Sequence, residues 1–354
     1  YEVNDTSKHK VQLSDGNNIY KVTNKAIYGQ IILTKTDRVN PDAKLRGARF
    51  QVFQDETCQT PLTDSSGAEV FMVTDTEGRA TATVPAAETG KTVYYLKEVS
   101  APDGYVLSDE IIKVEVEANH QTEVTAENDQ SRSIEVTKKD SVTAGVLGGA
   151  SFELYGPYDG DTLTAEEKAG LNKSSDTYIG KKTTNTSKGQ CTFSGLEPGK
   201  WYYLKEVGVP SGYKLSAEVK SIKTTEASSA NMRVSVDFRN DRLGKIIVQK
   251  TSNMDAGSQG TLPMAGVTFT LYRAKFEDGQ WQADGGQIAS GITALSGGAA
   301  SVVFDNLEPG DYLLQETVPE GYEPVADIHV QVTPGYNQTG YNHDHTTVVN
   351  NVAK

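Results

Sequence analysis

Cysteine and long apolar runs are scarce in this 354-residue chain, and positive charge is outweighed by negative charge. The two cysteines, Cys58 and Cys191, lie far apart in sequence, so no disulfide framework braces a set of small domains. The net charge of −13 argues against a nucleic-acid partner, which would require a basic stripe, and no apolar run is long enough to cross a membrane. A chain of this length suits two or three domains.

One stretch of the sequence occurs three times. YYLKEVSAPDGY at 94–105 returns as YYLKEVGVPSGY at 202–213 and, one residue shorter, as YLLQETVPEGY at 312–322. In each copy, alternation places a tyrosine and a leucine on one face of a strand, and a glutamate continues that face. A buried carboxylate is costly unless it is paired or protonated, so three at equivalent positions indicate a function. These residues are Glu98, Glu206 and Glu316.

A lysine and an asparagine recur with the same period. Apolar residues at alternate positions lead to an inward lysine near the start of each repeat and to an inward asparagine at its end. In the third repeat two asparagines are adjacent, and Asn351 is preferred to Asn350 because it keeps the alternation from Val349. The resulting pairs are Lys35 with Asn128, Lys138 with Asn240 and Lys250 with Asn351.

Short alternating runs separated by Gly, Pro, Asp and Asn predict an all-β protein made of tandem β-sandwiches. The predicted domains are 29–130, 131–242 and 243–354, and the short joints between them predict a stiff, elongated rod. Residues 1–28 are interpreted as the tail of a preceding domain, with a disordered leader as the alternative. No signal peptide or sorting tail is evident, so a secreted origin would make this chain an excised segment. Thr164 and Glu167 form a capping box that predicts one short surface helix in the second domain.

These motifs resemble the Cna B-type, prealbumin-like domains of Gram-positive surface proteins and pilins. The resemblance rests on a K-x-D strand, an L-x-G-A-x-F element, the Y-x-L-x-E-x-x-A-P-x-G-Y box and a last strand ending in Asn. It covers nearly all of residues 29–354. The third repeat departs from it, because no Asp follows two residues after Lys250 and its GA has become AGVTF.

The resemblance implies an immunoglobulin-like or prealbumin-like sandwich in which Lys and Asn join in a self-formed isopeptide bond, assisted by Glu. It therefore implies bonds from Lys35 to Asn128, from Lys138 to Asn240 and from Lys250 to Asn351. It also implies a stalk or shaft segment of a pilin or adhesin on a Gram-positive cell wall, joined by a sortase to neighbouring subunits or to the wall. The Y-P-K-type acceptor motif usual in shaft pilins is not present.

The residue types themselves support this chemistry. A lysine attacks only as a free amine, and burial can lower a lysine pKa by about 3–5 units. A buried, protonated glutamate can hydrogen-bond the asparagine carbonyl, polarise it and carry the proton that leaves with ammonia. No cofactor is needed. The alternative is a buried salt bridge between the lysine and the glutamate, to which the asparagine only supplies further hydrogen bonds.

Other candidate sites have weaker support. His343, Asp344 and His345 are interpreted as a polar loop, because adjacent residues on a strand would point to opposite faces and no third metal ligand is near in sequence. Neither cysteine has a CxxC partner. Trp201 and Trp281 are open to two interpretations, ligand contact or capping of a sandwich.

Three function classes remain. The leading one is a structural stalk, the second is an adhesin module that binds a host or extracellular-matrix ligand, and the third is an enzyme. No nucleophile–base pair, metal set or phosphate loop occurs outside the triples, and each triple would turn over once, on itself.

Overall fold

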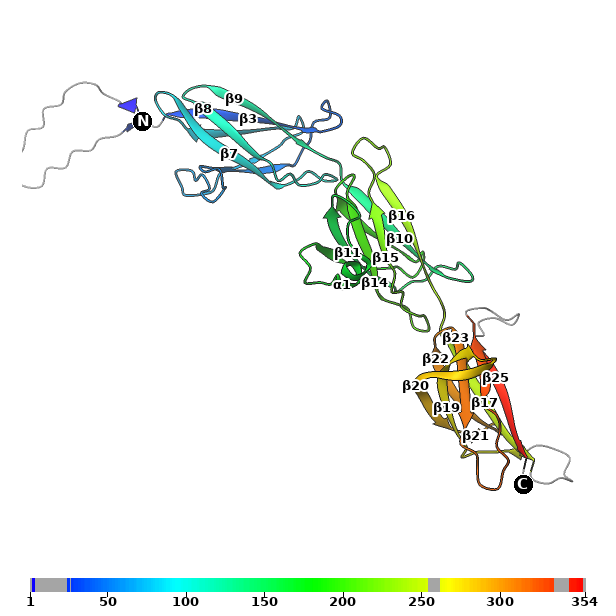
Figure 1. The fold of residues 1–354 in the computed structure, drawn as a ribbon. Helices are drawn as coiled ribbons and strands as arrows, with labels where there is room; N and C mark the ends of the chain where they lie inside the picture. The colour runs from blue at the N-terminus through cyan, green and yellow to red at the C-terminus, as the bar shows by residue number, and fades with distance from the viewer. Residues whose placement is uncertain (1, 4–23, 26, 254–261, 334–343, 353–354) are drawn as a thin grey trace, which may run out of the picture.

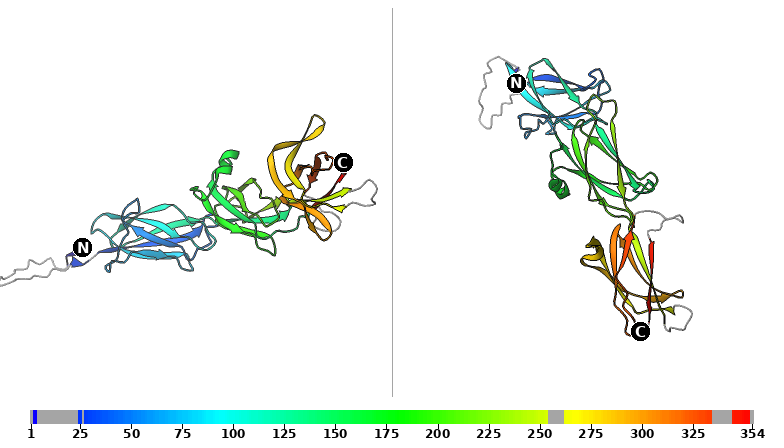
Figure 2. Two further views of the ribbon diagram at one scale, coloured as in Figure 1. Left: turned by 90° about the horizontal axis from the view of Figure 1, so that it is seen from below. Right: turned by 45° about the vertical axis from the view of Figure 1, so that its right-hand side comes forward.

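The computed structural model describes residues 2–3, 24–25, 27–253, 262–333 and 344–352. They form an elongated rod in which three β-sandwiches follow one another in chain order (Figure 1), and two further views show the same succession (Figure 2). The predicted all-β class with three tandem sandwiches is therefore confirmed. None of the helices in the described ranges is long and apolar enough to cross a membrane.

Most of the predicted tail lies outside the described residues. Within it, β1 (Glu2–Val3) pairs antiparallel with β2 (Asn24–Lys25).

The first sandwich packs a three-stranded sheet of order β6-β3-β9 against a four-stranded sheet of order β5-β4-β7-β8. Its first and last strands, β3 and β9, are parallel neighbours. The strands are β3 (Tyr28–Asp37), β4 (Arg49–Phe53), β5 (Phe71–Val73), β6 (Arg79–Pro85), β7 (Lys91–Ser100), β8 (Ile111–Glu117) and β9 (Gln121–Asn128).

The second sandwich repeats this plan, with sheets of order β13-β10-β16 and β12-β11-β14-β15. Again the first and last strands, β10 and β16, run parallel side by side. The elements are β10 (Arg132–Asp140), β11 (Ser151–Tyr158), α1 (Ala165–Gly170), β12 (Tyr178–Thr183), β13 (Gln190–Leu196), β14 (Trp201–Gly208), β15 (Val219–Lys223) and β16 (Arg233–Asn240).

The third sandwich has one sheet of order β18-β17-β22-β21, in which β25 also pairs parallel with β17, and a second of order β20-β19-β23-β24. The strands are β17 (Gly244–Asn253), β18 (Leu262–Pro263), β19 (Thr268–Glu277), β20 (Gln280–Ile292), β21 (Ala294–Ser296), β22 (Ala299–Leu307), β23 (Gly310–Glu316), β24 (Ile328–Val332) and β25 (Asp344–Val352).

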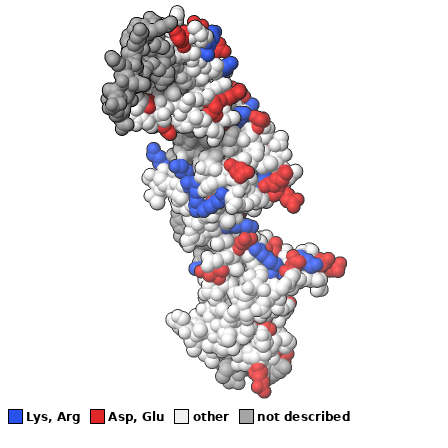
Figure 3. Space-filling model, turned by 90° about the vertical axis from the view of Figure 1, so that its left-hand side faces the viewer, with Lys and Arg blue, Asp and Glu red and all other residues white. Residues whose placement is uncertain are grey.

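Alternation along each strand explains why these segments fold as they do. In β10 every second residue is buried from Arg132 to Asp140, so one face meets the opposite sheet while the other is partly exposed. Each sandwich therefore has its own apolar core between its sheets. On the face drawn in Figure 3, acidic and basic side chains are scattered among residues of other kinds.

A buried threonine hydroxyl hydrogen-bonds to the backbone of the L-x-G-A-x-F element in each repeat. Thr74 accepts the backbone N–H of Ala48 at 2.9 Å and donates to the carbonyl of Leu45 at 2.7 Å. The equivalent residues in the other repeats are Thr184 and Thr293. The glycine of the element needs a left-handed backbone, with φ of 90°, 85° and 83° at Gly47, Gly149 and Gly266. Within this element the third repeat departs from the pattern at two positions, with Met264 in place of leucine and Val267 in place of alanine.

The predicted helix in the second domain is confirmed as α1, with both capping-box hydrogen bonds of Thr164 and Glu167 present. No residue of α1 itself is buried. The insertion around α1 contributes to the interior of the domain, because Leu171 packs with Tyr155 and Tyr203 in a second small apolar cluster.

Candidate functional site

The register of the parallel strand pair brings a lysine and an asparagine from opposite ends of a repeat together. In the first domain Asp37 lies opposite Asn128, two residues beyond Lys35 on the same face of β3. The second domain has the same register, with Asp140 opposite Asn240. Residues about one hundred positions apart therefore meet at the end of the sandwich where the chain leaves it.

The glutamate comes from the opposite sheet, where it is paired with a phenylalanine. Glu98 on β7 lies opposite Phe50 on β4, and the ring centroid of Phe50 is 5.4 Å from Lys35 Nζ. This phenylalanine is the last residue of each L-x-G-A-x-F element, and its place beside the lysine has no signal in the sequence pattern. The other two pairs are Phe152 with Glu206 and Phe269 with Glu316.

The second domain shows the most complete cluster. Lys138, Glu206 and Asn240 are 0%, 1% and 3% exposed. Glu206 Oε1 lies 3.3 Å from Lys138 Nζ, whereas Glu206 Oε2 accepts hydrogen bonds from Asn240 Nδ2 at 2.7 Å and from the backbone N–H of Ser216 at 2.9 Å. Lys138 Nζ also donates to Asn240 Oδ1. The carboxyl group thus bridges the amine and the amide nitrogen.

The first domain has the same arrangement. Glu98 Oε1 is 3.4 Å from Lys35 Nζ, and Glu98 Oε2 accepts from Asn128 Nδ2 at 2.9 Å and from the N–H of Ser108 at 2.8 Å. The Lys35 contact has the distance of an ion pair but not the geometry of a hydrogen bond. Lys35 Nζ, Glu98 Oε1 and Asn128 Oδ1 consequently have no hydrogen-bond partner in the described part of the chain. Each such atom costs about 1–3 kcal/mol when buried.

The third domain follows this plan in part. Lys250 Nζ is 3.5 Å from Glu316 Oε1, and both side chains are buried. The parallel pairing of β17 with β25 puts Ser252 opposite Asn351, so the backbone of Asn351, and not that of Asn350, has the register position of the other two asparagines. Neither oxygen of Glu316 has a hydrogen-bond partner within the described ranges.

Burial changes the ionisation of all three lysines. It lowers each lysine pKa below the ordinary value of 10.5, and this effect outweighs the attraction of the neighbouring glutamate. A larger fraction of each amine is therefore uncharged, which is the form that can attack a carbonyl carbon. The lysines are Lys35, Lys138 and Lys250.

The model of the SpaA prealbumin-like fold domain matches the sequence three times, over residues 29–130, 132–241 and 244–345. The chain belongs to this family. A comparison with curated proteins finds no match.

Three solved structures that are similar to the chain illustrate the comparison. The Bacillus anthracis TIE protein is 20% identical, with a TM-score of 0.34, and the match covers 92% of this chain and 51% of that one, so this chain spans about half its length. A streptococcal ancillary pilin is 17% identical, with a TM-score of 0.37 and coverage of 92% and 99%. The shaft pilin SpaA of Lactobacillus rhamnosus GG is 18% identical, with a TM-score of 0.33 and coverage of 61% and 98%.

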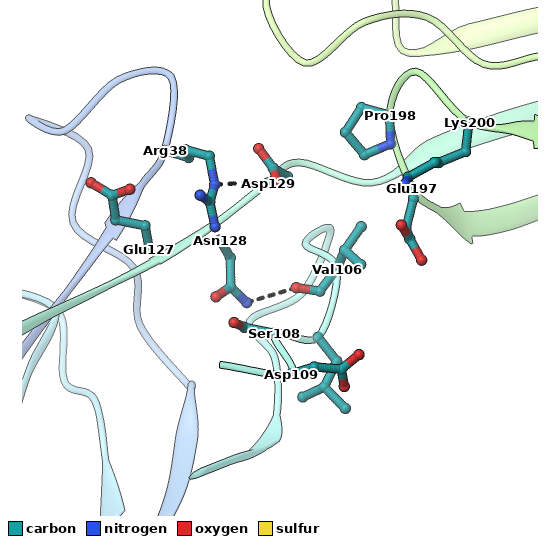
Figure 4. A pocket seen from close by; sticks show the side chains of 11 residues that line it. Arg38, Val106, Ser108, Asp109, Glu127, Asn128, Asp129, Glu197, Pro198 and Lys200 are labelled. Atoms are coloured by element: carbon teal, nitrogen blue, oxygen red, sulfur yellow. Dashed lines mark hydrogen bonds and ion pairs between the residues drawn. The ribbon is translucent and has the colours of Figure 1, made fainter. Parts of the chain in front are cut away.

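An open pocket adjoins the asparagine of the first SpaA-type domain. Its volume is about 270 Å³, and it lies where the first two domains meet, with residues 197–200 of the second domain on one side (Figure 4). Asn128, whose Nδ2 donates to the carbonyl of Val106 at 2.8 Å, is one of its lining residues. A pocket beside Asn240 occupies the equivalent place in the second domain. Each of the two asparagines therefore lies beside an open pocket.

One expected contact differs in the SpaA-type domains. The glutamate was expected to hydrogen-bond the asparagine carbonyl, but in both complete clusters it accepts from the amide nitrogen instead. The backbone N–H of Ser108 or Ser216 donates to the same carboxyl oxygen. Sequence reasoning missed these two donors because a backbone N–H leaves no residue-type signal.

The remaining candidates lie outside the clusters. His343 is not among the described residues. Asp344 and His345 begin β25, so the loop interpretation is wrong for these two residues. No group of three possible metal ligands occurs in the described part of the SpaA-type domains. Cys191 is buried, which raises the pKa of its thiol to about 11, and burial also raises the pKa of Cys58. Both thiols are thus poor nucleophiles.

Neither tryptophan is among the most exposed residues. Trp201 lines a shallow groove between β15 and β16. Trp281 stacks on His329 with ring centroids 3.7 Å apart, and His329 in turn contacts Asp311 at 2.8 Å. This stacking links β20 to β24 within one sheet and leaves Trp281 partly exposed.

Proposed function

We propose that each SpaA-type domain forms its own intramolecular isopeptide bond and that the chain is a stalk segment of a cell-surface protein. The bonds join Lys35 to Asn128, Lys138 to Asn240 and Lys250 to Asn351. The observation that carries the proposal is the glutamate carboxyl that bridges the lysine amine and the asparagine amide nitrogen in a buried site. One group touches both the atom that must lose a proton and the atom that must gain one.

The reaction in the second domain balances without another reactant. The uncharged Nζ of Lys138 attacks Cγ of Asn240, so that an N–C bond forms and the bond from Cγ to Nδ2 breaks. Glu206 takes a proton from Nζ through Oε1 and gives a proton to Nδ2 through Oε2. The products are a secondary amide and ammonia, which leaves through the adjacent pocket. Each site therefore reacts once.

A plain buried salt bridge accounts less well for the first domain. Taking an amine and a carboxylate out of water costs several kcal/mol per ion, and the cost is recovered only when further hydrogen bonds satisfy the pair. Here Lys35 Nζ and Asn128 Oδ1 remain without hydrogen-bond partners among the described residues. Conversion of the amine into an amide removes the buried charge and gives the nitrogen a covalent partner.

The position of each bond fits a load-bearing rod. The lysine lies near the end of the first strand and the asparagine ends the last, so tension would run along the first strand, cross the bond and leave the domain at the asparagine without loading the residues between them. With the rod shape (Figure 1), this supports a pilin or adhesin shaft outside a Gram-positive cell. Its partners would be neighbouring pilin subunits or the cell wall, joined by a sortase in the full-length protein.

Intact mass spectrometry of the unfolded chain tests the proposal, because each bond removes one ammonia. The expected mass is that of the sequence less three ammonia molecules. The full sequence mass would refute the mechanism, and a deficit of two with peptide mapping would identify the inactive domain.

A further inference from the structure

Each of the first two domains holds a second buried carboxylate, on the same face as the reactive lysine and two residues beyond it. Asp37 and Asp140 are 1% and 2% exposed. In the strand ladder each is the register partner of the reactive asparagine. Neither has a place in the chemistry above, although burying a carboxylate needs strong compensation.

Four donors surround each of these carboxylates. Asp140 Oδ1 accepts the backbone N–H groups of Val142 and Thr143, both at 2.9 Å. Asp140 Oδ2 accepts the hydroxyl of Tyr213 and Nε of Arg242, also at 2.9 Å each. Tyr213 is the last residue of the repeated box, and Arg242 is the second residue after the reactive Asn240. The aspartate thus joins three separate parts of the chain.

Asp37 is held in the same way at the first joint. Its Oδ1 accepts two backbone N–H groups of the following turn, and its Oδ2 accepts from Tyr105 at 3.0 Å and from Gln130 at 2.8 Å. Burial alone would raise the pKa of Asp37, but the hydrogen bonds outweigh it and hold the pKa below its usual range. Gln130 and Arg242 differ chemically yet occupy the same position, two residues after the asparagine.

Backbone hydrogen bonds extend this contact along the joint. Leu243 N–H donates to the carbonyl of Gly212, and Lys214 N–H donates to the carbonyl of Asp241, so the residues after Asn240 pair with the turn that ends the repeated box. The same two bonds recur at the first joint, between residues 104–106 and 129–131. The last strand is therefore fastened beyond its final ladder residue.

We infer that Asp37 and Asp140 are positioning residues for bond formation, which hold the end of the last strand so that the asparagine stays beside the lysine. This inference rests on the proposed function. Lys138 and Glu206 lie inside paired strands, whereas Asn240 is the last residue of β16, where a strand end would otherwise fray. A displacement of about 1 Å at a reacting atom can slow a reaction by about 100-fold. The third domain has Ser252 in this position and so has no carboxylate there.

The test follows Asp140→Asn in the full chain during cell-free synthesis. Peptide mapping over time quantifies the Lys138–Asn240 cross-link against the Lys35–Asn128 cross-link of the same molecules, which serves as the internal standard. We expect the second bond to form about 10–100-fold more slowly relative to the first. Asp161→Asn is the matched control, because Asp161 also accepts from side-chain donors but lies in the insertion, and it should leave the ratio unchanged.

Hydrogen exchange distinguishes a positioning role of Asp140 from a general contribution to the stability of the second domain. It is measured in the Lys138→Met variant, in which the second bond cannot form. A positioning role predicts that Asp140→Asn lowers protection at residues 239–243 while the rest of the second domain stays protected. If Asp140→Asn does not fold, Tyr213→Phe and Arg242→Ala each remove one donor, and each should slow the second bond. An unchanged ratio in the variants that fold would overturn the inference. If peptide mapping found no cross-link in the unmodified chain, the proposed function would be overturned instead.

Discussion

Under tension, the second domain should behave differently with and without its cross-link. Force enters at the start of β10 and leaves at the end of β16, two strands that lie side by side in parallel. With Lys138 bonded to Asn240, tension passes through the amide and the residues between them carry none. With Lys138→Met, only non-covalent interactions resist the pull. Methionine keeps the apolar stem of the lysine, but it leaves the buried carboxyl of Glu206 without its partner, which costs about 3–5 kcal/mol when the carboxyl stays charged.

The size of the effect follows from the chain. Lys138 and Asn240 are 102 positions apart, which at about 3.3–3.6 Å per residue corresponds to about 340–370 Å of released chain. Closing a loop of this length adds about 4–5 kcal/mol in the chain-entropy model, against the roughly 5–15 kcal/mol that stabilises a typical domain. The greater effect is kinetic, since an amide must break before the segment can extend.

Single-molecule force spectroscopy measures this directly. The unmodified chain should extend without unfolding steps from any of its three domains, and Lys138→Met should add one step of the length given above. Lys139→Ala is the matched control, because Lys139 makes only a partly exposed ion pair with Asp237, and it should add no step. Sawtooth unfolding of all three domains in the unmodified chain would refute the load-bearing role.

Three further outcomes are expected. Glu206→Ala should leave the second domain folded but without its isopeptide bond, because the apolar core persists while the proton carrier is lost. A continued loss of three ammonia molecules would disprove that role. As a control, Glu153→Ala, which removes a buried carboxylate that accepts a hydrogen bond from Tyr155, should keep all three isopeptide bonds. The rate of bond formation should fall as the pH is lowered, because acid protonates the amine. As the pH is raised, the rate should reach its maximum before pH 10.5, because burial lowers the lysine pKa. A rate independent of pH in a time course of cross-linked peptide would contradict this. The third domain should form its bond most slowly, because Glu316 has no hydrogen-bond partner among the described residues and Ser252 replaces the aspartate, and equal rates in all three domains would show that these contacts are dispensable.

Much of the fold could be predicted because β-strands carry a period that the sequence shows directly. Alternation identified the inward faces of β3, β10 and β17, and the capping box of Thr164 and Glu167 located α1. The repetition of Glu98 in three copies identified the candidate clusters. These signals are local, so they survive without knowledge of what each strand packs against.

The rest depended on contacts between distant residues. Alternation assigns a side chain to a face but does not say which strand lies beside it or in which register. The phenylalanine opposite each glutamate, the N–H of Ser108 on Glu98 and the hold of Asp37 on Gln130 all arise from such pairings. None of them changes the pattern of apolar and polar residues.

The sequence by itself determined that three β-sandwiches follow one another and that each carries an inward lysine, glutamate and asparagine, because side-chain period and repetition are properties of the chain alone. Only the tertiary structure decided that the carboxyl of Glu206 faces Lys138 with one oxygen and the amide nitrogen of Asn240 with the other. It also decided that Asp140 fastens the joint beyond that asparagine. Orientation and register come from the parallel pairing of the first and last strands, which exists only once the whole domain has closed.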